Sequence, residues 1–217
     1  MKEKLNKVRL PNKSIKTKNK ILSTILIFLF GVVLGIFSKW LDNLSINDSV
    51  WWQNILGILD LSNIFSMFGI WIFIAVIISV FSKTPLRASI NVLLFFIGMT
   101  VSYHLYTILF SGFNPMKYML IWYSITLISP LLAYICWYAK GKSKISMLIS
   151  SLILCVMFLS SFSIGMWYFD FKSIIDLLIF IGTIAVLYVN QKNTIYSLLT
   201  SIVLAFIISS IVIYIPI

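Results

Sequence analysis

The polar side chains best placed to form a binding site lie in and just before the third apolar segment of the chain, residues 88–110. They recur at steps of three and four residues, the spacing that brings side chains onto one face of a helix. An amide that faced lipid would be left unpaired, so this stripe is expected to face the interior of a helix bundle. It forms either the wall of a polar cavity or a set of hydrogen bonds between helices. The candidate pocket residues on it are Arg87, Asn91, Ser102 and Tyr106, with Phe95 and Gly98 between them.

The only histidine of the chain, His104, lies on the same segment but away from the stripe. An imidazole there could relay a proton or contact a ligand, which makes His104 a fifth candidate pocket residue. A hydroxyl on the next segment, such as Tyr123 or Thr126, could equally satisfy the ring. A hydrolase needs a base, an orienting group and an oxyanion site together. Nothing in the sequence pairs His104 with a nucleophile.

No motif of a known chemistry is present in the sequence. It has no Walker loop, no HExxH and no GxSxG, and Cys136 and Cys155 lie in apolar segments without a CxxC spacing. No acidic residue lies deep in an apolar segment, which argues against a carboxylate proton relay. We therefore expect no catalytic set, no metal site and no cofactor.

Seven apolar segments must position these candidates. With 60% hydrophobic and 11% charged residues, the chain has too little polar surface to cover a water-soluble globule. A helix needs about 20 apolar residues to cross a bilayer core about 30 Å thick. The sequence thus predicts an all-α, polytopic transmembrane helix bundle of about seven spans. The predicted spans are 21–37, 64–81, 88–110, 116–138, 145–169, 174–189 and 195–215.

Positive charge gathers at alternate joints between these spans. Every lysine and arginine falls on one side of the predicted bundle except Lys39, Lys117 and Lys172. The positive-inside rule then places the N-terminus in the cytoplasm and, with an odd number of spans, the C-terminus outside.

Two domains follow from this pattern. Residues 1–20 form a basic cytoplasmic tail, which we expect to lie against anionic lipids, and residues 21–217 form the transmembrane bundle. The positive charge is explained by topology, so no nucleic-acid partner is expected. In the long joint after the first span, residues 49–61 are expected to form an amphipathic helix in the outer interface, with Trp51 and Trp52 at headgroup depth. A lid over an external opening is the alternative.

Prolines and small residues in the sequence predict where helices begin or bend and where they pack closely. Thr84-Pro85 and Asn114-Pro115 are expected to start helices, and Pro130 to kink one. Small residues at four-residue spacing let helices approach closely, either within this chain or between subunits. These packing residues are Gly31 and Gly35, Ser161 and Gly165, and Ser197, Ser201, Ala205 and Ser209.

The leading functional expectation is an integral membrane subunit without catalytic chemistry of its own. It would handle or sense a small or amphipathic molecule, in a transport-related role, beside a membrane or ATPase partner subunit. One alternative is an intramembrane enzyme that uses His104 on a lipid-linked substrate, and another is a membrane scaffold or self-protection accessory protein. The Ile-, Lys- and Asn-rich usage resembles that of bacteria with AT-rich genomes, which suggests a multi-pass protein of the bacterial cytoplasmic membrane.

Overall fold

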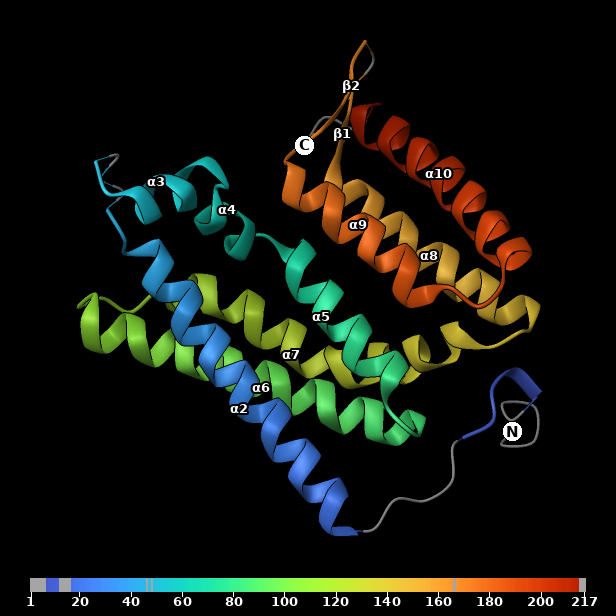
Figure 1. Cartoon of the computed structure of the whole chain (residues 1–217), viewed down its shortest axis with the longest axis horizontal. Coiled ribbons are helices and arrows are strands. Elements are labelled where there is room, and N and C mark those ends of the chain that lie inside the picture. Colours follow the sequence, from blue (N-terminus) through green and yellow to red (C-terminus); the bar gives the residue numbers. More distant parts are fainter. Residues whose placement is uncertain (1–6, 12–16, 46, 48, 166, 215–217) are drawn as a thin grey trace.

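The computed structural model is almost entirely helical and describes residues 7–11, 17–45, 47, 49–165 and 167–214, without the side chains of 212–214 (Figure 1). This confirms the predicted all-helical class, and five helices are long and apolar enough to cross a bilayer, which is compatible with a multi-pass membrane protein. They are α2 (Thr17–Asp42), α6 (Pro85–Phe110), α7 (Met116–Trp137), α8 (Lys144–Ser161) and α10 (Gln191–Tyr214).

The two other predicted spans are short helices. Both α5 (Phe68–Phe81) and α9 (Ile174–Leu187) have 14 residues, fewer than the about 20 that a straight crossing needs. The structure therefore has five helices of spanning length and two shorter apolar helices where the sequence predicts about seven spans.

The helices form two groups joined by α5, which lies near the centre of Figure 1. In the first group α6 packs between α2 and α7, and in the second α8 packs against α9 and α10. Helix α5 contacts α6 and α7 on one side and α9 on the other. Consecutive helices α7 and α8 meet near the short helix η1 (Tyr138–Lys140) and diverge from there (Figure 1).

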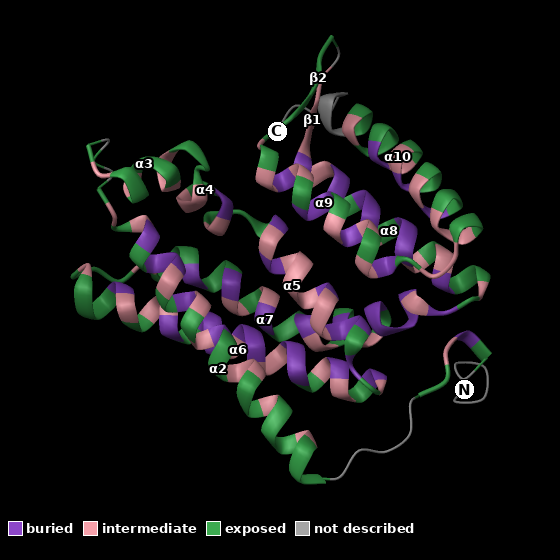
Figure 2. Cartoon of the chain, viewed as in Figure 1, coloured by how far each residue is buried: buried purple, intermediate pink, exposed green. Residues whose placement is uncertain are grey.

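Two apolar cores hold these groups together. Trp71 of α5 packs with Phe95 of α6 and Trp122 of α7, while Phe158 of α8 packs with Phe180 of α9. The outer faces of α2 and α10 stay exposed along most of their length (Figure 2). Exposed faces this apolar are suited to lipid rather than to water.

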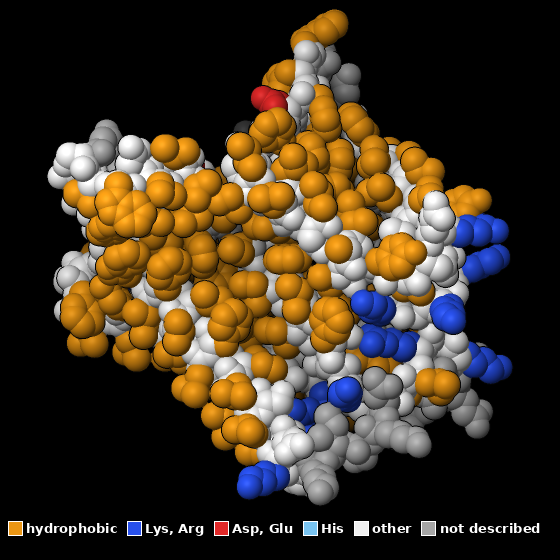
Figure 3. Space-filling view, viewed as in Figure 1, with side chains coloured by type: hydrophobic (Ala, Val, Ile, Leu, Met, Phe, Trp, Pro, Cys, Tyr) orange, Lys and Arg blue, Asp and Glu red, His pale blue; other side chains and the backbone are white. Residues whose placement is uncertain are grey.

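Charge divides the bundle into two ends. Lysines and arginines gather around η1 and the start of α8, at the lower right of Figure 3, and we call this the basic end. The described acids, Asp42, Asp60, Asp170 and Asp176, belong to segments at the other end, which we call the acidic end.

Most helix starts follow their sequence signals. The Thr84 hydroxyl accepts a hydrogen bond from the Arg87 backbone at the start of α6, as predicted. Asn114 does not cap α7, because its side chain is bound to His104 instead. Within α7, Pro130 has no N–H to offer the Thr126 carbonyl, and the Ser129 hydroxyl donates to that carbonyl at 2.8 Å.

The predicted span 145–169 is wrong in its last third, residues 162–169. Helix α8 ends at Ser161, and β1 (Phe162–Ile164) pairs with β2 (Phe169–Phe171) in an antiparallel hairpin. Aromatic and branched side chains alternate with polar ones in both strands, a period of two that a helix cannot use. Gly165 follows the first strand, so it does not share a helix face with Ser161 and the predicted packing pair does not form.

The predicted helix 49–61 forms over its central part, as α3 (Trp51–Ile58). The chain breaks at Asp60, where φ is 49°, and a second short helix that was not predicted, α4 (Leu61–Ser66), follows. Aspartate tolerates this left-handed conformation better than most residues do. A right-handed helix cannot continue through a residue in this conformation.

Much of the predicted tail 1–20 and the C-terminal Ile217 lie outside the described residues. Lys7–Pro11 is described, and it packs against the basic end of the bundle: Val8 is buried beside Trp137 and Tyr138. A side chain at Gly141 would collide with the Val8 carbonyl, so the glycine lets this segment lie close. We call residues 7–11 the strap.

Candidate functional site

The predicted polar stripe of α6 is used for contacts between helices. The Asn91 side chain is only 4% exposed, and its carboxamide nitrogen donates to the Ser82 hydroxyl at 3.2 Å. Its carbonyl oxygen accepts from the Thr24 hydroxyl of α2 at 2.9 Å. The Trp137 indole donates to the Ser82 backbone carbonyl at 2.7 Å. One network thus ties together α2, α5, α6 and α7, with both ends of the amide satisfied.

Ser102 lies where α2 and α6 cross most closely. Its hydroxyl donates to the Val32 carbonyl of α2 at 3.0 Å. A side chain at Gly31 would collide with the Phe95 carbonyl, and one at Gly35 with Ser102 and the Met99 carbonyl. These glycines therefore permit the backbone contact that the predicted packing pair implied.

The remaining stripe residues lie at the two ends of α6. Arg87 donates to the Lys20 carbonyl at 2.8 Å, which joins α6 to the start of α2. Tyr106 is half-buried and its ring lies 4.6 Å from that of Phe110 on the same helix. Arg87, Asn91, Ser102 and Tyr106 thus make separate local contacts, and none of them lines the cavity or the groove described below.

His104 connects α6 to the start of α7. Its Nε2 lies 2.8 Å from Asn114 Oδ1, and its Nδ1 lies 2.6 Å from the Tyr123 hydroxyl. Because the amide oxygen only accepts, Nε2–H donates to it and, in the neutral ring, Nδ1 accepts from the tyrosine. Tyr103 turns elsewhere and donates to Asp42 at 2.7 Å. Among the described residues, the hydrogen-bond partners of the His104 ring are this amide and this phenol, and no carboxylate is among them.

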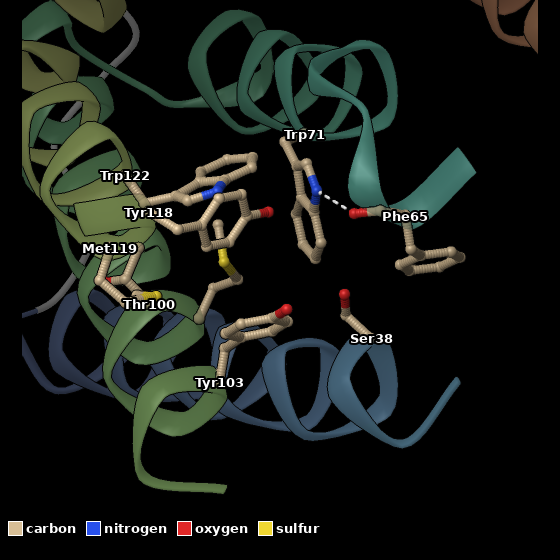
Figure 4. A pocket seen from close by; sticks show the side chains of 9 residues that line it. Ser38, Phe65, Trp71, Thr100, Tyr103, Tyr118, Met119 and Trp122 are labelled. Carbon is tan, nitrogen blue, oxygen red and sulfur yellow. Dashed lines mark hydrogen bonds between the residues drawn. The ribbon is translucent and has the colours of Figure 1, made fainter. Parts of the chain in front are cut away.

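An aromatic cluster near the acidic end surrounds a small cavity between α2, α5, α6 and α7 (Figure 4). Trp71, Tyr103, Tyr118 and Trp122 lie around it, and the Trp71 indole donates to the Phe65 carbonyl at 2.8 Å. The cavity measures about 10 Å³, room for one water molecule. It is too small for an organic ligand.

A much larger hollow lies between α7 and α8, where the two helices diverge. It measures about 410 Å³, within the usual range for small-molecule sites. We call it the groove. Its floor is formed by buried residues of α5 and α6, among them Val76 and Val92. Its rim is exposed, with Leu132 at 57%, Ile135 at 44%, Leu152 at 52% and Val156 at 48%. The groove therefore opens sideways, onto the apolar surface of the bundle.

The walls of the groove offer almost no polar contact. Ser79 donates to the Ala75 carbonyl at 2.7 Å and Ser129 to the Thr126 carbonyl at 2.8 Å, so both hydroxyl donors are already used. The other lining side chains are hydrocarbon apart from the Cys136 thiol. An apolar cavity of this kind does not hold ordered water and favours a hydrocarbon occupant.

Sequence reasoning missed the groove, and none of the five candidate pocket residues lines it. Its signal is a set of small residues at four-residue spacing on two helices, Ala75 and Ser79 on α5 and Ser129 and Ala133 on α7. Such stripes usually mark close helix contact. In this protein the small side chains of α5 and α7 instead leave room for the groove.

The small-residue stripe of α10 does lie against its own bundle. Ser197 donates to the Met147 carbonyl of α8 at 3.2 Å. Ser201 and Ala205 are fully buried on the same side, and Ser209 is half-buried. This places the stripe in contact between α8 and α10.

The strap brings a cation to the basic end of the groove. Arg9 donates to the Trp137 carbonyl and, at 2.9 Å, to the Val80 carbonyl. Both carbonyls belong to the last turns of their helices, where a cation is favoured by the negative end of the helix dipole. The guanidinium also lies 4.2 Å from the centre of the Trp137 ring. Burial lowers the pKa of Arg9 from its ordinary value, although an arginine stays charged in a protein.

Comparison with known proteins adds no family assignment. The sequence matches no protein-family model, and no similarity to a curated protein or to a solved structure is detected. Within the described residues no cluster of three His, Cys, Asp or Glu side chains could hold a metal ion. Functional inference therefore depends on the groove and its surroundings.

Proposed function

We propose that this chain is a multi-pass protein of the bacterial cytoplasmic membrane that binds an apolar or amphipathic molecule in the groove between α7 and α8. In this role it is a subunit without catalytic chemistry of its own, which handles or senses its ligand in a transport-related process beside a membrane or ATPase partner. The basic end faces the cytoplasm, which accords with the positive-inside rule.

The observation that carries the proposal is the groove itself. An apolar volume of about 410 Å³ with a laterally exposed rim is open to molecules already dissolved in the bilayer. The lining hydroxyls are satisfied, so specificity for the buried part of the ligand comes from shape and apolar contact. A hydrocarbon chain meets both requirements.

A photoreactive phospholipid tests this assignment. A lipid with a diazirine in its acyl chain, added to the purified protein in nanodiscs, should label the groove-lining faces of α7 and α8. Leu132→Trp fills the rim and should reduce this labelling severalfold. Leu131 is a neighbouring exposed leucine that does not line the groove, so Leu131→Trp is the matched control and should leave labelling unchanged.

The same comparison is available on α8, where Leu152 lines the groove and Leu148 is exposed outside it. Leu152→Trp should reduce labelling and Leu148→Trp should not. Equal labelling in all four variants would mean that the groove is ordinary lipid-facing surface, and the proposed function would then be wrong.

A further inference from the structure

The basic end of the groove places charge directly beside hydrocarbon. Ser79 and Cys136 line this end, and the next residues on their helices, Val80 and Trp137, supply the two carbonyls that accept from Arg9. Ile149 lines the groove and also packs against the apolar cluster of Val8 and Trp137. The strap therefore borders the groove.

A second cation lies beside the first. The Lys140 ammonium is 4.7 Å from the centre of the ring of Phe81, the residue after Val80, whose carbonyl accepts from Arg9. Burial and, to a smaller extent, the positive charge of Arg9 lower the pKa of Lys140. The described carboxylates belong to the acidic end, so none of them compensates this pair. Two adjacent, partly desolvated cations with no described carboxylate beside them favour the binding of an anion.

Arg9 has N–H donors left with which it could bind an anion. A guanidinium has five N–H donors, and the two bonds to helix carbonyls use two of them. Arginine and lysine together suit a phosphate, which accepts charge-assisted hydrogen bonds from both. Basic pockets between transmembrane helices on the cytoplasmic side are a usual place for lipid headgroups.

We propose that the ligand of the groove is an anionic phospholipid of the inner leaflet, with one acyl chain in the groove and its headgroup phosphate held by Arg9 and Lys140. This inference rests on the proposed function, since it assigns the headgroup of the same occupant. It makes the strap part of the binding site: Val8 and Gly141 fix the position of Arg9, and Arg9 contacts the ligand.

Two lipids with identical chains separate the headgroup from the chain. Delipidated protein in detergent is titrated with phosphatidylglycerol, which is anionic, and with phosphatidylcholine, which is zwitterionic, and the bound states are measured by native mass spectrometry. The wild-type protein should prefer phosphatidylglycerol. Arg9→Gln should reduce this preference about fivefold, the expected effect of one basic residue near an anionic headgroup. It should weaken phosphatidylcholine binding less, because the choline already offsets the charge of that lipid's phosphate.

Lys140→Gln provides the same test with the two Arg9 bonds left in place, and should reduce the preference by a similar factor. Lys7→Gln is the matched control, because Lys7 is an exposed residue of the same strap and the change in charge is identical. Its effect should stay small. Leu132→Trp should weaken both lipids equally, since it removes the chain site.

The outcomes distinguish the two proposals. An equal loss of preference in Lys7→Gln and Arg9→Gln would mean diffuse surface charge and overturn the headgroup assignment, as would equal affinity of the wild type for both lipids. Competition by glycerol phosphate, which has the headgroup but no chain, would show a free-phosphate site and overturn it as well. Unchanged binding of both lipids in Leu132→Trp would instead refute the groove as the chain site.

Discussion

At the scale of single residues, polar side chains of this protein connect helices to each other. Asn91 bonds both Thr24 and Ser82, and His104 bonds both Tyr123 and Asn114. In hydrocarbon an unpaired polar group is costly, so the donors and acceptors of these residues are used within the bundle. Arg9 has donors left for a ligand, and no helical periodicity singles it out.

Asn91→Leu should reduce stability and spare ligand binding. The substitution removes two hydrogen bonds between helices, and the expected loss in unfolding free energy is about 1 kcal/mol, since such bonds in membranes contribute about 0.6 kcal/mol on average. Unfolding in mixed micelles measures the loss, and Thr24→Val should show about half of it. Loss of lipid binding at unchanged stability would instead mean that the ligand binds at the polar stripe of α6.

At the scale of elements, small residues have two opposite roles, since some allow close helix contact and others line a cavity. Gly31, Gly35 and Gly98 allow α2 and α6 to touch along their backbones. Ala75, Ser79, Ser129 and Ala133 line the groove instead, because α5 and α7 are joined by other contacts and α8 diverges from α7. The same residue types therefore give close packing in one place and a cavity in another.

Gly35→Ala should separate α2 from α6. The added methyl group meets the Met99 carbonyl and Ser102, and the backbone cannot move aside cheaply, so we expect a loss of about 1–3 kcal/mol in unfolding free energy. Gly182→Ala is the matched control: its methyl group would lie 3.0 Å from the end of the Phe73 ring, which can rotate away. A comparable loss in both variants would show that helix propensity and packing at Gly35 have been misjudged.

At the scale of the whole molecule, positive charge and the groove lie on the same side. The strap packs against η1 and the chain just before α8, where lysines and arginines are concentrated (Figure 3). The lysines and arginines that predict the orientation and the two cations that we propose to bind the ligand thus lie at one end of the bundle. An anionic lipid bound there would lie in the leaflet that the positive-inside rule makes cytoplasmic.

Thiol labelling in intact cells tests this orientation. Lys142→Cys and Lys192→Cys should resist an impermeant maleimide, because both residues belong to the basic side, whereas Asp170→Cys in the hairpin should react. The native thiols Cys136 and Cys155 are buried and give a low background. Labelling of Lys142→Cys from outside would reverse the orientation, and with it the choice of leaflet.

The sequence by itself determined the helical class, most of the helices and their sorted charge. Apolar runs of sufficient length form helices in a bilayer whatever their neighbours, because the backbone must satisfy its own hydrogen bonds there. Local rules also identified Thr84 at the start of α6 and the helix contact at Gly31 and Gly35. They failed where a short-range alternative competed, as in the hairpin after Ser161, and they did not predict the short helix α4 after Asp60.

Only the tertiary structure decided which polar residues are consumed by packing and where space remains. Periodicity places Asn91 on an inward face but cannot say whether the inside holds a ligand or the hydroxyls of Thr24 and Ser82. The groove arises from the angle between α7 and α8, and Arg9 reaches it through a segment distant in sequence. Cavities and long-range contacts depend on how helices cross, and that information is not contained in any one helix.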